Sequence, residues 1–355
     1  MSEVFVVPAE RRGMELDEFL CLLFPAWNKG FLRREVREGR VLVDGAVALP
    51  STRLRTDQVL LVDIDPESAP RMPLAPKEKV RVLYDGGSWR VVDKPPGLAV
   101  EPERWDRDAG SLQGALLRDS IEESGRGAVP GGRGIEARPR LVHRIDKGTS
   151  GAVIVAFSIE AERSFRAAFE SGGVEKSYLA LVEGEHPLAD GESEVIDLPI
   201  GPDPRRSGRM QVWPDARETG ERKRGRKGLP PAKASRTRVE VERRFRGYTL
   251  LRCSPLTGRT HQIRVHLAHV GFPLAVDHLY GRRDALLLSA FKSGYRPKPG
   301  RPERPLIDRL TLHAESVVIP PMEGVAAERV RISSPLPKDF ARVLKQLEKH
   351  RKLNR

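Results

Sequence analysis

The sequence has few cysteines, few aromatic residues and no long apolar run. Its two cysteines, Cys21 and Cys253, are too few for a disulfide framework and are typical of a protein of the reducing cytoplasm. No run of about 18 apolar residues is present, so no segment is expected to span a membrane. The first residues, MSEVFVVPAE, lack the basic, apolar and small-residue segments of a secretory signal. We therefore expect a soluble, cytoplasmic protein.

Nucleotide-binding motifs are also missing from the sequence. Neither a P-loop nor a dinucleotide-binding fingerprint is found, so no nucleotide cofactor is expected. Three neighbouring histidines, His261, His266 and His269, leave a metal-dependent hydrolase open as an alternative. Their spacing disfavours it, because zinc-binding helices place histidines at i and i+4 with an acidic residue between them. We expect no metal.

Positive charge is abundant and unevenly distributed. The net charge is +13, and residues 201–233 carry ten Lys or Arg against four acids. Residues 341–355 carry six against one, so the two stretches supply +6 and +5 of the total. Clustered cations are what contact with nucleic acid phosphates requires. The alternative for either stretch is a solvated basic segment without a partner.

A small unit is predicted within residues 14–63. One helical face is indicated by four apolar residues, Leu16, Phe19, Leu20 and Leu23. Asn28 is predicted to cap a second helix that ends near Gly39 and gathers Lys29, Arg33, Arg34 and Arg37. Two β-rich runs follow, with a tight turn at Asp44 and Gly45. This pattern resembles the alpha-L RNA-binding motif, or S4-like domain, and the resemblance implies that the four cations bind RNA. An interaction domain that does not touch RNA is the alternative.

The rest of the chain is predicted to be one larger α+β domain. We assign residues 1–65 to the small α/β RNA-binding domain and the Pro-rich, charged residues 66–78 to a linker. Short Val-rich strands alternating with turns and helices predict a mixed, largely antiparallel sheet over residues 79–340. Residues 341–355 are expected to form a basic tail. Surface insertions are expected at 101–110, 120–138, 215–230 and 283–305.

The most informative segment is RLVHRIDKGTSGAVIVA, residues 140–156, in which a charged turn leads into an apolar strand. An aspartate in a turn is by itself more often a surface or capping residue. The string HRIDKGTSG, however, resembles the HRLDxxTSG signature of RluA-type pseudouridine synthases, with Ile145 in place of leucine. The resemblance implies that Asp146 is the catalytic carboxylate.

Further segments resemble the same family in the same order. They are RVVDKPPGL at 90–98, KSYLALVEG at 176–184, TGRTHQIRVHLAHVGFPLAVDHLYG at 257–281 and LTLHAESVVIP at 310–320. The resemblance implies that Tyr178 is the active-site tyrosine and that Arg264 pairs with Asp146. It also implies that Arg144 fills the gap left by a flipped base, although a plain phosphate contact is the alternative. His143 is interpreted as a structural residue of the loop.

The implied reaction agrees with these residue types. Uridine isomerisation breaks the nitrogen–ribose bond, turns the uracil and rejoins it through carbon, without redox change, cofactor or metal. Asp146 can either attack the anomeric carbon or remove a neighbouring ribose proton, and both routes stay open. The predicted partner is structured RNA, ribosomal more than transfer RNA, bound by a monomer. The alternatives are a transfer RNA pseudouridine synthase and a non-catalytic RNA-binding or ribosome assembly factor.

Overall fold

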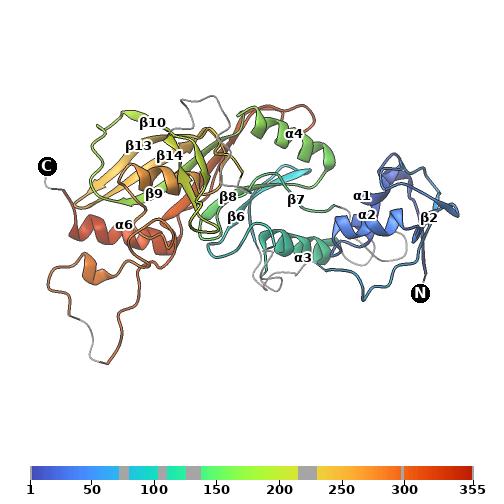
Figure 1. The fold of residues 1–355 in the computed structure, drawn as a ribbon, viewed down its shortest axis with the longest axis horizontal. Helices are drawn as coiled ribbons and strands as arrows, with labels where there is room; N and C mark the ends of the chain where they lie inside the picture. Colours follow the sequence, from blue (N-terminus) through green and yellow to red (C-terminus); the bar gives the residue numbers. More distant parts are fainter. Residues whose placement is uncertain are drawn as a thin grey trace.

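The computed structural model describes residues 2–71, 80–102, 110–124, 137–214, 230–296 and 300–353. Most of the expected linker at 66–78 and nearly all of the expected basic insertion at 215–230 lie outside these ranges. The N-terminal unit forms one end of the molecule, and the C-terminus lies near the opposite end (Figure 1).

The N-terminal unit consists of two helices packed on a small antiparallel sheet. The helices are α1 (Leu16–Leu23) and α2 (Lys29–Arg37), preceded by the 3-10 helix η1 (Ala9–Arg11). The sheet has the order β1-β4-β2-β3, formed by β1 (Glu3–Val6), β2 (Val41–Val43), β3 (Ala46–Val47) and β4 (Val59–Val62). The first helix buries the predicted apolar face together with the rest of the unit's core.

Two predicted local signals form as expected in this unit. The side chain of Asn28 accepts hydrogen bonds from the backbone N–H groups of Gly30 and Phe31, at 2.8 and 3.3 Å, and so caps α2. Asp44 and Gly45 both have positive φ, 50° and 77°, as a tight turn between β2 and β3 requires.

The larger domain is built on one mixed sheet with the order β10-β13-β14-β9-β15-β8-β6-β5. All pairs along this path are antiparallel except β15 with β8. Its strands are β5 (Arg81–Asp85), β6 (Trp89–Lys94), β8 (Ser150–Ala156), β9 (Glu175–Glu183), β10 (Ser193–Asp197), β13 (Arg236–Phe245), β14 (Tyr248–Pro255) and β15 (Leu312–Ile319). This confirms the predicted α+β class with a mixed, largely antiparallel sheet.

Shorter strands complete the domain. On the main sheet, β8 pairs with β7 (Arg140–Leu141) and β15 pairs with β16 (Val330–Ser333). A separate hairpin is formed by β11 (Ile200–Pro202) and β12 (Met210–Val212).

Both faces of the main sheet are covered by helices (Figure 1). One face packs on α3 (Leu112–Ser124) and α5 (Gln262–His269). The other packs on α4 (Ile159–Glu170) and α6 (Lys338–His350). Burial on both sides explains why β8, with the sequence SGAVIVA, is buried throughout and is apolar from Ala152 to Ala156 without alternation.

A glycine makes the parallel contact between β8 and β15 possible. Gly151 has φ of 118°, and a Cβ atom there would lie 2.2 Å from the carbonyl oxygen of Ala314. A side chain at this position would push the two strands apart. Because β8 begins directly after the loop that carries Asp146, this close packing fixes where that loop starts.

The C-terminal stretch differs from the expected basic tail. Residues 338–350 form the helix α6, and Phe340, Val343 and Leu347 are fully buried in the domain core. The expected boundary at residue 340 falls inside this helix. Its cations occupy the outward face, which is the usual arrangement for an amphipathic surface helix.

Two of the expected insertions are also more ordered at their edges than predicted. The helix α3 continues to Ser124, beyond the expected start of a loose stretch at residue 120. Within 283–305, Leu286 and Phe291 are buried and a 3-10 helix, η4, covers Leu288–Ala290. Among the described residues, no helix has the length and apolarity needed to cross a membrane.

The small unit contacts the larger domain through a mostly buried ion pair. The carboxylate of Glu18 on α1 accepts a hydrogen bond from Arg140 on β7, and Arg140 also bonds Glu162 at 3.3 Å. Burial opposes ionisation of Glu18, but hydrogen bonds from Arg140 and Lys29 hold its pKa below the usual value. Leu22 packs against Leu117 of α3 beside this pair.

Candidate active site

A cleft of about 1670 Å³ opens beside the sheet and contains the residues predicted for catalysis. Its floor includes the loop between β7 and β8, which carries Asp146. Its walls come from the ends of α4 and β9 and from the segment between β14 and α5. The structure thus brings Asp146, Tyr178 and Arg264 together from three distant parts of the sequence.

The loop of Asp146 is held from below by a buried lysine. The ammonium group of Lys94, at the end of β6, donates to the carbonyl oxygens of Pro95, Leu98 and Lys147 at 2.9, 2.7 and 3.1 Å. Burial lowers the pKa of Lys94 to about 7. Three carbonyl acceptors need three N–H donors, which only the protonated amine has, so these bonds favour the ammonium form.

Arg264 connects the catalytic loop to a second, deeper carboxylate. Its NH1 nitrogen lies 3.0 Å from Asp146, while its Nε and NH2 nitrogens bond both oxygens of Asp277 at 2.7 and 2.8 Å. The Asp277 side chain is fully buried and also accepts from the backbone N–H groups of Leu279 and Tyr280. Burial opposes its charge, but Arg264 and these backbone donors hold the pKa of Asp277 below its usual value.

An aromatic ring and an imidazole complete the surroundings of Arg264. The guanidinium carbon lies 5.0 Å from the ring centroid of Tyr280, whose hydroxyl is 2.9 Å from Nδ1 of His261. His261 adopts the left-handed conformation, φ 56° and ψ 21°, directly before α5. A non-glycine residue in this conformation is costly, and such residues cluster at functional sites. Burial lowers the pKa of His261, so its imidazole is neutral at pH 7.

Tyr178 lies in the cleft wall with only 8% of its surface exposed. Burial and the negative charge of Asp146 raise the pKa of its phenol, which is therefore protonated at neutral pH. Its ring is available to stack on a planar base, and its hydroxyl can donate a hydrogen bond.

The two residues before Ile145 have different environments. Arg144 is exposed at the cleft, with its side chain 3.4 Å from the hydroxyl of Thr260 and 3.9 Å from Glu101. His143 is half-buried, and its Nε2 atom accepts a hydrogen bond from the backbone N–H of Ile154 at 2.8 Å. Burial and nearby Lys176 lower the pKa of His143 to about 3. A neutral imidazole that binds backbone fits the predicted structural role.

The four cations predicted on the N-terminal unit are not equivalent. Lys29 bonds Glu18 and lies 3.4 Å from Asp17, and Arg33 lies 3.5 Å from Asp17. Arg34 pairs with Glu35 and Glu38. Arg37 is exposed, and within the described ranges it forms no ion pair. Part of the charge expected to meet RNA therefore neutralises acids of the unit itself.

Two of the three histidines considered as metal ligands have other partners. His266 is buried, and its two ring nitrogens contact Thr237 and the carbonyl of Leu198. His261 contacts Tyr280 as described. In the part of the chain that the structure describes, no group of His, Cys, Asp and Glu side chains has the arrangement of a metal site.

Comparison with known proteins identifies the class to which this cleft and fold belong. A family model described as RNA pseudouridylate synthase matches residues 88–269, and a model described as S4 domain matches residues 14–60. The chain therefore belongs to the RNA pseudouridylate synthase family. It is an RNA pseudouridine synthase of the RluA type, an isomerase, with an N-terminal S4 domain.

Curated relatives align over nearly the whole chain. Ribosomal large subunit pseudouridine synthase D of Xanthomonas campestris is 33% identical over 96% of this chain and 91% of the relative. The enzyme of the same name from Pseudomonas aeruginosa is 32% identical over 97% and 95%. Ribosomal large subunit pseudouridine synthase C of Haemophilus ducreyi is 30% identical over 97% and 95%.

A solved structure has the same fold. Human RNA Pseudouridylate Synthase Domain Containing 4 superimposes with a TM-score of 0.53, covering 76% of this chain and 93% of that one at 22% identity. At this identity the likeness concerns the fold alone.

Sequence reasoning did not single out Lys94, Asp277 or Tyr280. All three lie inside the quoted motifs, in DKPPGL and in VDHLYG. The available signal was a charged residue close to the end of an apolar run, Lys94 two residues after Val92 and Asp277 directly after PLAV. A charge placed where a strand enters the core needs a buried partner, and that partner is what the structure supplies.

Proposed function

We propose that this protein isomerises uridines of large-subunit ribosomal RNA with Asp146 as the catalytic carboxylate. The observation that carries the proposal is the contact between Asp146 and Arg264 at 3.0 Å, at the floor of a cleft that Tyr178 also lines. The relatives named for the large ribosomal subunit, together with the S4 domain, favour ribosomal RNA as the substrate.

The proposed chemistry begins at the sugar of a flipped uridine. Asp146 either bonds to the anomeric carbon or removes a neighbouring ribose proton, and in both cases the bond from ribose to N1 breaks with its electron pair left on uracil. The uracil turns within the cleft, and its C5 atom forms the new bond to the anomeric carbon. In the first route the ester bond to Asp146 breaks in this step and regenerates the carboxylate; in the second, Asp146 returns the proton to the ribose. The C5 proton then leaves, and N1 gains a proton. Arg264 stabilises the negative charge of Asp146 at the start of this sequence.

Tyr178 and Arg144 have supporting roles in this proposal. The neutral phenol of Tyr178 supplies a ring face that holds uracil while it turns. If Asp146 becomes esterified, its negative charge disappears, and with it one of the two causes that raise the pKa of Tyr178. The phenol then loses its proton more easily, and its oxygen can accept the C5 proton. Arg144 is exposed at the cleft, and we propose that it fills the gap that the flipped base leaves.

Asp146→Asn tests the proposal, because the amide keeps the shape of the side chain but can act neither as nucleophile nor as base. The variant should bind unmodified large-subunit ribosomal RNA with wild-type affinity and form no pseudouridine with enzyme in excess, since affinity rests on phosphate contacts elsewhere. Isomerisation within about tenfold of wild type would remove Asp146 from the central role.

Mapping of pseudouridine in a deletion strain tests the substrate. Loss of a modification from large-subunit ribosomal RNA is expected. Loss confined to transfer RNA would support the alternative substrate, and an unchanged map would favour a non-catalytic assembly factor.

A further inference from the structure

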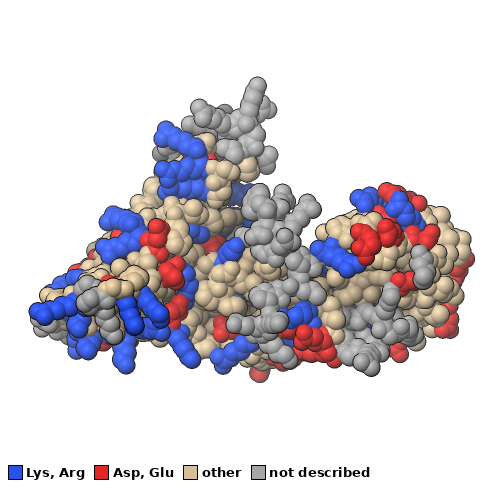
Figure 2. Space-filling view, turned by 90° about the horizontal axis from the view of Figure 1, so that it is seen from below, with Lys and Arg blue, Asp and Glu red and all other residues tan. Residues whose placement is uncertain are grey.

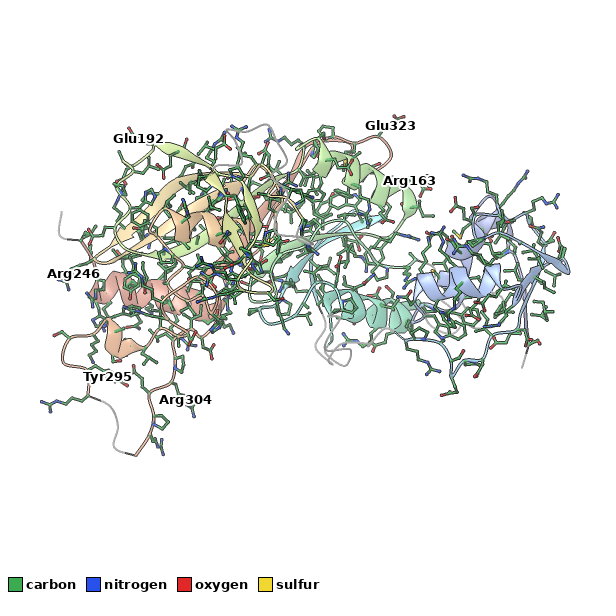
Figure 3. All side chains as sticks on the ribbon, viewed as in Figure 1. Arg163, Glu192, Arg246, Tyr295, Arg304 and Glu323 are labelled. Carbon is green, nitrogen blue, oxygen red and sulfur yellow. The ribbon has the colours of Figure 1, made fainter. Side chains whose placement is uncertain are left out.

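A basic arm projects from the catalytic domain at the end away from the S4 domain. We define the arm by its two described limbs, residues 287–296 and 300–306. Figure 3 shows Tyr295 and Arg304 on this arm, away from the body of the domain. Figure 2 shows Lys and Arg side chains gathered at the same end of the molecule. These limbs contain four Lys or Arg and a single acid, Glu303.

The base of the arm is well anchored. The backbone N–H of Leu286 donates to the carbonyl of Ile307, and the N–H of Leu306 donates to the carbonyl of Leu286, each at 2.8 Å. The side chains of Leu286 and Ile307 are buried. Phe291 is buried and packs edge-to-face on Tyr248, with ring centroids 5.5 Å apart. Arg351, after α6, donates to the carbonyl of Ala290 at 2.7 Å. An anchored base distinguishes the arm from a merely solvated loop.

The cations of the arm have no internal role. Lys292, Arg296, Arg301 and Arg304 are exposed, and within the described part of the chain their side chains form no ion pair or hydrogen bond. The one acid of the arm instead ties its limbs together, since Glu303 accepts from the backbone N–H of Ser289 at 2.9 Å. Elsewhere on this protein exposed arginines are often paired with acids, as Arg329 is with Glu175. The arm therefore presents uncompensated positive charge.

Short segments connect the base of the arm to the catalytic cleft. Leu279 lines the cleft eight residues before the arm, and Arg309 lines it three residues after. The base itself packs in the core on the other face of the sheet, with Leu286 and Ile307. A limb of ten residues spans at most about 30 Å. RNA that extends from the cleft past these segments thus comes within reach of these cations.

We propose that the arm binds the phosphate backbone of the substrate RNA outside the target nucleotide. This rests on the proposed function. RNA fits better than an acidic protein because the arm offers separate point charges on an extended support with few apolar side chains, which suits a chain of phosphates and gives a protein little apolar surface to bury.

A matched pair of triple variants tests the arm in the full-length protein. The arm variant is Arg296→Gln, Arg301→Gln and Arg304→Gln, with Lys292 kept because it adjoins the Phe291 anchor. The control variant is Arg81→Gln, Arg163→Gln and Lys338→Gln, three exposed cations that also form no ion pair among the described residues. Both variants lower the net charge by three from +13, so a general charge effect acts on them equally.

The measurement is binding to unmodified large-subunit ribosomal RNA transcript over a range of salt concentrations. The arm variant should bind about tenfold more weakly near 0.15 M salt, and its log–log salt dependence should be shallower by about 2 to 3. Its pseudouridine formation should fall at low RNA concentration and recover as RNA is raised. The control variant should keep the wild-type affinity and slope.

Two results would overturn the role of the arm. One is wild-type RNA affinity and slope in the arm variant, which includes the case of an arm that binds an acidic protein. The other is an equal loss in both variants. Pseudouridine formation by the wild type on the same transcript tests the proposed function separately, since it does not depend on how the variants compare.

Discussion

Arg264 is fixed by Asp277 through two nitrogens before its third nitrogen reaches Asp146. The deeper pair is almost completely withdrawn from solvent, with 6% of the Arg264 side chain and none of the Asp277 side chain exposed. The catalytic loop is therefore not paired with a freely moving cation. It pairs with a guanidinium whose orientation is fixed by Asp277.

Asp277→Asn should lower catalytic activity although Asp277 itself does not contact the substrate. The reason is that the amide cannot keep both charged hydrogen bonds that orient the Arg264 guanidinium. We expect pseudouridine formation under single-turnover conditions to fall about 100-fold, as a small misplacement of a catalytic group can cause. Unfolding in denaturant should show a loss of about 3 to 5 kcal/mol, since a buried arginine loses its main carboxylate.

Asp284→Asn is the control for this variant, because Asp284 is an exposed acid paired with His278. It should change stability by less than about 0.5 kcal/mol and leave turnover unchanged. Near-normal turnover in Asp277→Asn at temperatures where it remains folded would show that Asp146 does not depend on the orientation of Arg264.

His143 predicts a pH dependence of stability. Its pKa is about 3 in the folded protein, because of burial and Lys176, against about 6.5 in an unfolded chain. Between these values the unfolded chain binds a proton that the folded protein does not, so the free energy of unfolding falls as pH falls from 6.5 towards 3. The contribution is at most about 1.4 kcal/mol per pH unit.

His143→Gln removes this titration, while the amide oxygen can still accept from Ile154. The free energy of unfolding of both proteins, measured in denaturant between pH 4.5 and 7.5, should change less with pH for the variant. Above pH 7 the two profiles should have the same slope, because His143 is then neutral in the folded and unfolded states. Parallel profiles over the whole range would mean that His143 accepts a proton in the folded state.

The S4 domain should separate cations that bind RNA from cations that support the fold. Arg37→Gln should weaken RNA binding and lower the salt slope by nearly one, with stability unchanged within about 0.5 kcal/mol. Lys29→Gln should instead lower the free energy of unfolding by about 1 kcal/mol or more, because Asp17 and Glu18 are buried acids that lose a partner. Equal effects of the two variants on stability would contradict this division.

Local features of the fold were predictable because their causes are local. The cap at Asn28 and the turn at Asp44 and Gly45 depend on neighbours within three residues. The contact between Asp146 and Arg264 was predicted only from the resemblance to the family. Hydrophobic periodicity could not predict it, because 118 positions separate the two residues.

The position of α6 and the burial of Lys94 and Asp277 depend on tertiary contacts that the amino-acid composition does not indicate. Residues 341–355 were interpreted through their charge as a basic tail, yet Phe340, Val343 and Leu347 lie on one face of α6 and place this helix in the core. Lys94 and Asp277 belong to residue types that are rarely buried. Their burial becomes understandable only when the loop carbonyls and the guanidinium that they hold are seen.

The ion pair between Glu18 and Arg140 holds the S4 domain at a set distance from the catalytic domain. With α1 held against β7, and Leu22 against Leu117, the interval between the S4 surface and Asp146 is a property of the fold and not of a free tether. RNA gripped at both places must bridge that interval. We therefore expect a uridine in the right local sequence, but at the wrong distance from the segment bound by the S4 domain, to be modified poorly, so that target choice depends on distance as well as on bases.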